Sequence, residues 1–361
     1  MRLPAFLRRS RPSLDEEWSG YPESRLKDII LFLTDRCNMR CDHCMFWKRI
    51  DAPGNEMALE ELQRIALSAP PLRTAAMTGG EPFLRNDLAK IVEIFFRDNH
   101  THHIQINTNG LLLERMEELA QRDLAARYER HLTFQISLDG LEETHERLRR
   151  APGSFKKIVR NAKRLAELAK EHPYFHAVIL TNINKENYHE IEATADYIRE
   201  NTGIAHAFDL VRGAGFSAWN VPEAILENED PRDCGLPPLE ALESIVETVK
   251  RIYARDGADF GPFMRQMEIQ AALYLGKPTP YRCLTAGRTI GAIYSDGAVA
   301  ACEFTKPFAH LADYDFDLGR LWNSLEAQER RGQITGCVCC HTCFVLTSLQ
   351  EWEDRRVARR S

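Results

Sequence analysis

The sequence predicts an α/β fold built on a parallel sheet. Short apolar runs of strand length alternate with longer stretches of helical periodicity. The starts of the short runs lie roughly 30 to 45 residues apart, which is the usual length of a strand–helix unit. Such repeated units favour parallel pairing with right-handed crossovers. At 361 residues, 44% of them hydrophobic, the chain is long enough to bury a large core.

Six strands and five intervening helices are expected. The strands cover residues 28–33, 73–78, 103–107, 131–138, 175–180 and 206–211. The helices cover 58–68, 88–97, 112–122, 154–170 and 188–201, with Ser154 expected to cap the fourth helix. Six units are too few for a closed eight-stranded barrel, and chemistry on parallel barrels sits where the strands end.

Ten cysteines fall mainly in two tight groups. Cys37, Cys41 and Cys44 follow the first strand in a C-x3-C-x2-C spacing, and four more lie between 337 and 343. Tight groups indicate metal ligation in a reducing cytosol rather than a disulfide framework, so a cytoplasmic protein is expected. Three thiolates suit an iron–sulfur cluster with one open iron. A structural zinc knuckle is the alternative, but it normally needs a fourth ligand.

The first group resembles the signature of radical S-adenosylmethionine (SAM) enzymes, although His43 stands where the family usually has an aromatic residue. The resemblance implies an open (β/α)6 partial barrel. It also implies a 4Fe-4S cluster on Cys37, Cys41 and Cys44, whose open iron binds the amino and carboxylate groups of SAM. Gly79-Gly80-Glu81-Pro82, at the end of the second strand, looks like the family's GGEP motif, which contacts the SAM amino group.

Later strand ends add candidate SAM contacts. Asn107 either points into the barrel or belongs to a turn. Ser137 and Asp139 share one strand face. In relatives with a SPASM domain the Ser of this motif touches SAM, and an Arg twelve residues later pairs with the SAM carboxylate. That position is Arg149 here, and a solvated helix face is its alternative.

The fifth and sixth strand ends are less specific. Asn182 could meet the adenine or ribose, or serve an Asx turn. Arg212 is a candidate for the SAM carboxylate or the substrate. The adjoining Gly213-x-Gly215-x-x-Ala218 fits a loose dinucleotide fingerprint, but Pro222 would interrupt the helix that the motif requires. Residues 219–238 are expected to form a loop over the barrel mouth or a domain boundary.

The last part of the chain is expected to hold a β-hairpin over 289–294 and 298–301, and a helix over 318–330. The spacing C-x13-G-x4-C from Cys283 to Cys302 resembles the SPASM and twitch auxiliary-cluster domains. The cysteines here are too few for two further clusters. The resemblance therefore implies one auxiliary 4Fe-4S cluster, on Cys283, Cys302 and two of Cys337, Cys339 and Cys343. A four-cysteine zinc site is the rival reading.

Four segments are expected: a basic arm over 1–24, the partial barrel over 25–235, a helical linker over 236–275 with helices at 239–253 and 266–275, and a SPASM/twitch-like domain over 276–361. The net charge of −6 gives no polyanion-binding signature, so no nucleic-acid partner is expected. No apolar run approaches the roughly 20 residues of an integral membrane segment.

The resemblance implies an enzyme that reductively cleaves SAM to a 5′-deoxyadenosyl radical, which abstracts a hydrogen atom from a substrate. Flavodoxin or ferredoxin would supply the electron. A ribosomally made peptide is the preferred substrate class, and a small biosynthetic intermediate is the alternative. The 27 residues before the first strand are too few for an added peptide-recognition domain. A non-catalytic iron–sulfur or zinc scaffold is the minor alternative.

Overall fold

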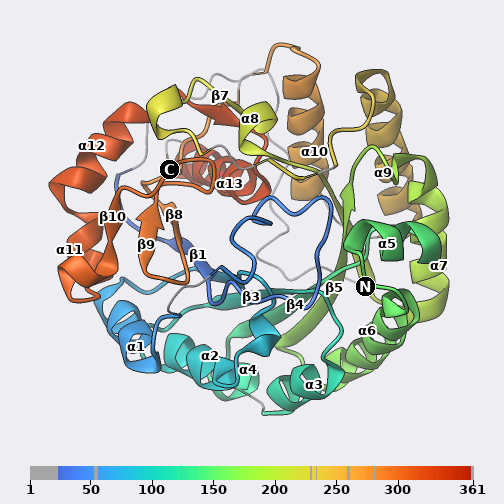
Figure 1. Cartoon of the computed structure of the whole chain (residues 1–361), viewed down its shortest axis with the longest axis horizontal. Coiled ribbons are helices and arrows are strands. Elements are labelled where there is room, and N and C mark those ends of the chain that lie inside the picture. Colours follow the sequence, from blue (N-terminus) through green and yellow to red (C-terminus); the bar gives the residue numbers. More distant parts are fainter. Residues whose placement is uncertain are drawn as a thin grey trace.

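The computed structural model describes residues 23–358 except 53–55, 123, 228–229, 233, 258–260 and 280. The expected basic arm therefore lies almost wholly outside the described residues. Figure 1 shows a curved sheet ringed by helices. In the described part of the chain, no helix is both long enough and apolar enough to cross a bilayer.

Six parallel strands form the centre of the fold, as predicted. They are β1 (Asp28–Phe32), β2 (Thr74–Thr78), β3 (His103–Thr108), β4 (His131–Ser137), β5 (Phe175–Ile183) and β6 (Ala205–Leu210). Each strand pairs in parallel with the next one along the chain. Their carboxyl ends therefore meet at one edge, where a parallel barrel carries its chemistry.

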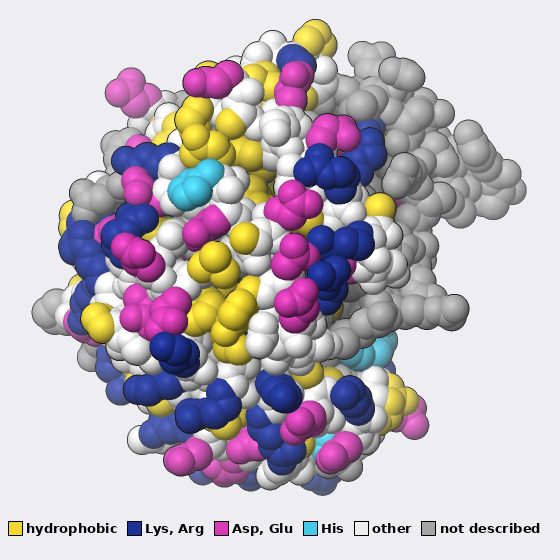
Figure 2. All heavy atoms as spheres, turned by 90° about the vertical axis from the view of Figure 1, so that its right-hand side faces the viewer, with side chains coloured by type: hydrophobic (Ala, Val, Ile, Leu, Met, Phe, Trp, Pro, Cys, Tyr) yellow, Lys and Arg dark blue, Asp and Glu magenta, His cyan; other side chains and the backbone are white. Residues whose placement is uncertain are grey.

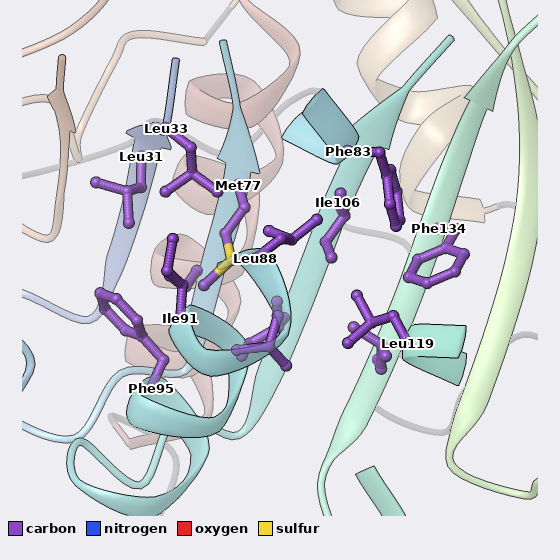
Figure 3. Packing of buried hydrophobic residues seen from close by; sticks show 14 of the residues in the cluster. Leu31, Leu33, Met77, Phe83, Leu88, Ile91, Phe95, Ile106, Leu119 and Phe134 are labelled. Carbon is purple, nitrogen blue, oxygen red and sulfur yellow. The ribbon is translucent and has the colours of Figure 1, made fainter. Parts of the chain in front are cut away.

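Helices cover the outer side of this sheet (Figure 1). They are α1 (Leu59–Ser68), α2 (Leu88–Arg97), α3 (Leu113–Gln121), α4 (Leu124–Arg127), α5 (Glu142–Arg149), α6 (Ser154–Glu171) and α7 (Ile191–Thr202). Strand side chains such as Leu31, Met77 and Ile106 pack against Ile91 and Phe95 of α2 (Figure 3). Each fully buried side chain of this kind contributes about 1.5–3 kcal/mol. This packing fixes the strand ends that carry the site.

Two predicted helices differ in detail. Gly153 (φ 74°), rather than Ser154, occupies the cap position of α6, and Ser154 is the first helical residue. The expected helix over 318–330 is two helices, α11 (Leu318–Trp322) and α12 (Leu325–Gln333). The break occurs because the Ser324 hydroxyl accepts a hydrogen bond from the Ala327 N–H at 3.2 Å and starts a new helix.

The predicted hairpin extends the same sheet. β8 (Ile290–Ile293) pairs in parallel with β1, and β9 (Ala298–Ala300) and β10 (Ala309–His310) follow in antiparallel pairing. The strand order is β10-β9-β8-β1-β2-β3-β4-β5-β6. The turn between β8 and β9 contains Gly297 (φ 94°), as its Asp-Gly sequence predicts. The division of the chain at residue 276 stays a prediction.

Three long helices lie between β6 and the residues just before β1. α9 (Leu242–Arg255) follows a short 3-10 turn, and α10 (Gly261–Tyr274) begins before its predicted range. Both pack on β6 through buried residues such as Phe208, Val249 and Met267. α13 (Thr342–Ala358) packs on α10, and its Glu351 pairs with Lys27 beside β1 at 2.5 Å.

Short elements complete the chain between these helices: η2 (Pro82–Leu84), η3 (Tyr188–Glu190), α8 (Ala214–Ser217), β7 (Ala218–Trp219), η4 (Glu223–Ile225), η5 (Leu239–Ala241), η6 (Leu311–Tyr314) and β11 (Val338–Cys339). β7 and β11 pair with each other as a small second sheet.

The outer face over α5, α7 and α9 mixes positive and negative side chains rather than separating them (Figure 2). Arg147 pairs with Glu186 at 2.8 Å, and Arg255 pairs with Asp196 at 2.7 Å. Exposed pairs contribute only about 0–1 kcal/mol each, so the buried contacts decide the stability of this side.

Candidate active site

The loop after β1 brings three thiols to the carboxyl edge of the sheet. A cavity of about 180 Å³ lies there, between this loop and the ends of β2, β3 and β4. Nine of the predicted site residues line it: Cys37, Cys41, Cys44, Gly79, Gly80, Glu81, Asn107, Ser137 and Arg149. The structure therefore gathers residues that are more than 100 positions apart in sequence.

Gly79 and Gly80 hold the cysteine loop against the end of β2. A Cβ at Gly79 would lie 2.3 Å from the Thr34 carbonyl oxygen, and one at Gly80 would lie 2.0 Å from that of Arg36. The Gly80 N–H donates to Thr34 O at 2.7 Å, and the Glu81 N–H donates to Arg36 O at 2.8 Å. The two glycines thus permit close approach of the chain to itself, besides lining the cavity.

Glu81 links the ends of β2 and β3. Its carboxylate is buried and accepts hydrogen bonds from the Phe83 N–H, the Thr108 hydroxyl and the Asn109 N–H at 2.7–3.1 Å. Burial raises the pKa of Glu81 to about 7, although these three hydrogen bonds favour the charged form. Both of its oxygens are therefore already engaged by donors of the protein.

Asp139 organises the cationic side of the cavity without lining it. One carboxylate oxygen receives Nε and Nη2 of Arg149 at 2.8 and 2.6 Å, and Nε2 of His43 at 3.1 Å. Burial opposes the charge, but Arg149 and His43 hold the pKa of Asp139 well below its usual range. Arg149 is buried, so the solvated-face alternative is wrong. Its third nitrogen, Nη1, lies 3.8 Å from the Cys41 sulfur.

Two other predicted contacts lie outside the residues that line the cavity. The Asn182 N–H donates to Asp139 Oδ1 at 2.8 Å, and its carbonyl accepts from Asn184 and Asn187, so its backbone belongs to a turn network. Arg212 lies beyond the end of β6, where Nη1 is 3.4 Å from Asp209 Oδ2. The positive charge of Arg212 favours the negatively charged forms of Glu303 and Cys343. Both assignments to SAM stay predictions.

The three thiols of the loop lie beside hydrogen-bond donors and a cation that favour a negative charge on sulfur. Burial raises the pKa of Cys37 to about 11 and that of Cys44 to about 12, so metal binding must supply the energy to ionise them. Backbone N–H groups of Met39 and Phe46 face Cys37 and Cys44, and Arg149 faces Cys41. Among the described residues, no group of three or more His, Cys, Asp or Glu is arranged to hold a metal ion.

The C-terminal cysteines separate into two sets. The thiol of Cys283 is hydrogen-bonded to those of Cys337 and Cys339. A negative charge on Cys283 would raise the pKa of Cys302. All four are buried. Cys343, at the start of α13, instead faces Glu303 and Arg212, although its side chain also packs against the cluster that contains the other four.

Two further cysteines point elsewhere. The sulfur of Cys340 lies 3.8 Å from the carbonyl of Gln270 in α10, which agrees with its omission from the predicted ligands. Cys234 is buried near Lys185 and Glu186, and burial raises its pKa to about 12. It does not line the cavity.

The sequence did not single out two residues that line the cavity, Trp47 and Arg232. The Arg232 guanidinium lies 4.4 Å from the centre of a Trp47 ring. The two residues are 185 positions apart, and neither belongs to a recognisable motif. The only available signal was the expectation that residues 219–238 cover the barrel mouth.

Residues 31–198 match the family model described as Radical SAM superfamily. This stretch is a radical SAM domain. Among curated relatives, it is 27% identical to GTP 3′,8-cyclase of Paenarthrobacter nicotinovorans, over 82% of this chain and 85% of that protein. It is 23% identical to Fe-coproporphyrin III synthase of Methanosarcina barkeri, over 84% of this chain and 75% of the relative.

Among solved structures, SuiB of Streptococcus suis bound to S-adenosylmethionine matches with a TM-score of 0.60 and 16% identity. The match covers 85% of this chain and 68% of SuiB. At this identity the likeness shows the fold alone, and it confirms the predicted partial barrel.

Proposed function

We propose that the cavity at the ends of β1 to β4 binds a 4Fe-4S cluster and SAM. The observation that carries the proposal is the convergence of Cys37, Cys41 and Cys44 with Gly79-Gly80 and Arg149 on one cavity. When bound, these cofactors would supply reductive cleavage of SAM to a 5′-deoxyadenosyl radical that takes a hydrogen atom from the substrate. Flavodoxin or ferredoxin is the proposed reductant.

The protein's own residues would then orient and stabilise these groups. The three thiolates would hold the cluster, and Arg149 beside Cys41 would stabilise its negative charge. Carbonyl groups of Gly79 and Gly80 would receive the SAM ammonium, and Asn107 and Ser137, which line the same cavity, would contact the rest of the ligand. Asp139 would act through Arg149 and His43, as a positioning residue.

We further propose one auxiliary 4Fe-4S cluster, held by Cys283, Cys302, Cys337 and Cys339. The mutual interactions of these buried thiols favour Cys337 and Cys339 over Cys343 as the last two ligands. Four sulfurs would complete such a cluster without an open iron. A zinc ion on the same four residues is the rival, because zinc also takes four thiolates.

Two substrate classes remain proposals. Peptide modification is supported by the SPASM-like cysteine spacing, and SuiB, one of the structural neighbours, has been solved with the precursor peptide SuiA. A small-molecule substrate is supported by the names of the curated relatives, a GTP cyclase and a coproporphyrin synthase. A screen of both classes for substrate-dependent consumption of SAM would separate them.

The central experiment is anaerobic purification, followed by iron and sulfide counts and incubation with dithionite and SAM. We expect 5′-deoxyadenosine and methionine from the wild type. Cys41→Ala should form neither, whereas Cys340→Ala, which alters a buried cysteine outside both ligand sets, should form both. Wild-type protein with bound iron that yields no 5′-deoxyadenosine would refute the proposal.

The same samples test the auxiliary cluster. About eight iron atoms per chain are expected for two 4Fe-4S clusters. Cys339→Ala should lose close to half of the iron, and Cys343→Ala should keep it. One zinc and four iron atoms per chain would instead establish the zinc alternative.

A further inference from the structure

A short segment, Asp230–Arg232, is fixed across the mouth of the cavity. The Asp230 carboxylate accepts a hydrogen bond from the Gly215 N–H at 2.8 Å, and its backbone carbonyl accepts from Trp47 Nε1 at 3.1 Å. The segment is therefore tied both to α8, which follows β6, and to the cysteine loop. These contacts place the side chain of Arg232 among the lining residues of the cavity.

The Gly213-x-Gly215 pair explains why Asp230 can come so close. A Cβ on Gly213 would lie 2.4 Å from Asp230 Oδ1, and one on Gly215 would lie 2.5 Å from Oδ2. The two glycines thus make room for a carboxylate of the same chain instead of a nucleotide phosphate. The motif positions the segment that carries Arg232.

Arg232 differs from the other arginines that line the cavity. Arg40 pairs with Asp51 and with the carbonyls of Cys37 and Met39, and Arg149 pairs with Asp139. No carboxylate among the described residues pairs with Arg232, whose partner is the Trp47 ring at 4.4 Å. Contact with an aromatic face leaves the edge of a guanidinium available for hydrogen bonds.

The charges around Arg232 favour an anion. Among the described residues that line the cavity, Glu81 is the only acidic one, and its two oxygens already accept three hydrogen bonds from the protein. A second cation, Lys48, lies 5.7 Å from the centre of the Trp47 ring. An anionic group at the mouth would therefore meet positive charge with little competition from carboxylates.

We propose that Arg232 binds an anionic group, a carboxylate or phosphate, of a molecule held in this cavity. The inference rests on the proposed function and deepens it. A planar guanidinium suits both groups, because it can donate two parallel hydrogen bonds to either. The anion belongs either to SAM, through its carboxylate, or to the substrate, and binding measurements separate these two sources.

The test compares Arg232→Ala and Arg232→Lys with Arg64→Ala, which removes an exposed arginine of α1 that does not line the cavity. Anaerobically purified protein is titrated calorimetrically with SAM, and then with inorganic pyrophosphate in the presence of SAM. Loss of a charge-assisted interaction predicts roughly a tenfold or greater weakening for Arg232→Ala. Arg232→Lys should fall in between, because it keeps the charge without the planar fork.

Weaker binding of SAM by Arg232→Ala assigns the anion to the SAM carboxylate. Unchanged SAM binding with weaker pyrophosphate binding assigns it to the substrate. Equal behaviour of Arg232→Ala and Arg64→Ala in both titrations overturns the proposal, as does wild-type protein that binds neither ligand.

Two controls keep the test independent of folding and of the proposed function. Trp47→Leu keeps Arg232 but removes the ring beside its guanidinium. It should weaken binding of the same ligand that Arg232→Ala binds more weakly. Formation of 5′-deoxyadenosine by the wild type is measured separately. Its absence would refute the proposed chemistry, whereas the pyrophosphate titration would still report on Arg232.

Discussion

Asp139 is completely enclosed by protein, and its two carboxylate oxygens serve different neighbours. One oxygen balances Arg149 and His43, and the other orients the backbone at Asn182. The sequence placed Asp139 among the SAM contacts because it shares a strand face with Ser137. It could not reveal that His43, which departs from the family's usual aromatic residue, would be the partner of this carboxylate.

Replacing Asp139 with Asn should destabilise the protein by about 3 kcal/mol, because it leaves the buried Arg149 charge without its counter-charge. Urea unfolding monitored by circular dichroism measures the change. Asp296→Asn is the control, since Asp296 is about half exposed and its pair with Arg49 spans 3.6 Å. A loss no greater than that of the control would contradict the role assigned to Asp139.

Gly80→Ala should disrupt the cysteine loop, because the new methyl group would lie 2.0 Å from the Arg36 carbonyl. We expect a large drop in the iron bound per chain after anaerobic reconstitution. Gly332→Ala is the matched control, since a Cβ there meets nothing within 4 Å and the residue lies in α12. That variant should gain roughly 0.5–1 kcal/mol of stability. Normal iron binding by Gly80→Ala would show that the loop tolerates the displacement.

At the level of elements, local patterns predicted most of the barrel. The first residues of β1, β3, β4 and β5 agree with the predicted boundaries. β5 runs to Ile183, beyond its predicted end, because Thr181 and Asn182 pair with β6 despite their polar side chains. The parallel pairing of β8 with β1 had no local signal, since the partners are about 260 residues apart.

The amino ends of β3, β4 and β5 carry a row of histidines that should make folding sensitive to acid. His131 Nδ1 lies 3.0 Å from His176 Nε2, and His103 Nε2 lies 2.9 Å from the Thr133 hydroxyl. Burial lowers the pKa of His103 to about 3 and that of His176 to about 4. The unfolded chain, with histidine pKa values near 6.5, therefore binds protons before the folded chain does.

Stability from these groups is complete above about pH 6.5 and is lost as the pH falls toward the folded-state values. His103 alone should account for about 2 kcal/mol of loss between pH 7 and pH 5. Urea unfolding at the two pH values should show a smaller loss for His103→Gln than for the wild type. His189→Gln, at an exposed histidine, should behave as the wild type does. Equal pH dependence of stability in all three proteins would show that His103 does not contribute to the loss of stability in acid.

At the level of the whole molecule, β8 to β10 extend the sheet of the barrel beyond β1. Phe32 of β1, Phe46 of the cysteine loop and Tyr294 after β8 pack with ring centres 4.7–6.4 Å apart. One buried cluster holds Ile30 and Ala76 together with Cys283 and Cys302. The sequence located both cysteine groups, but their connection through one core depends on pairings between distant parts of the chain.

This shared core predicts that the barrel and the cysteine-rich segment unfold together. In hydrogen exchange measured at increasing urea, amides of β4 and of β8 should lose protection at the same midpoint, because β8 is hydrogen-bonded to β1 within one sheet. The anaerobically purified protein is used, so that metal loss does not separate the transitions. A chain ending at residue 275 should be insoluble, since it would expose Ile30, Phe32 and the unpaired edge of β1. Two well-separated midpoints, or a soluble and folded 1–275 fragment, would show that the segments are independent domains.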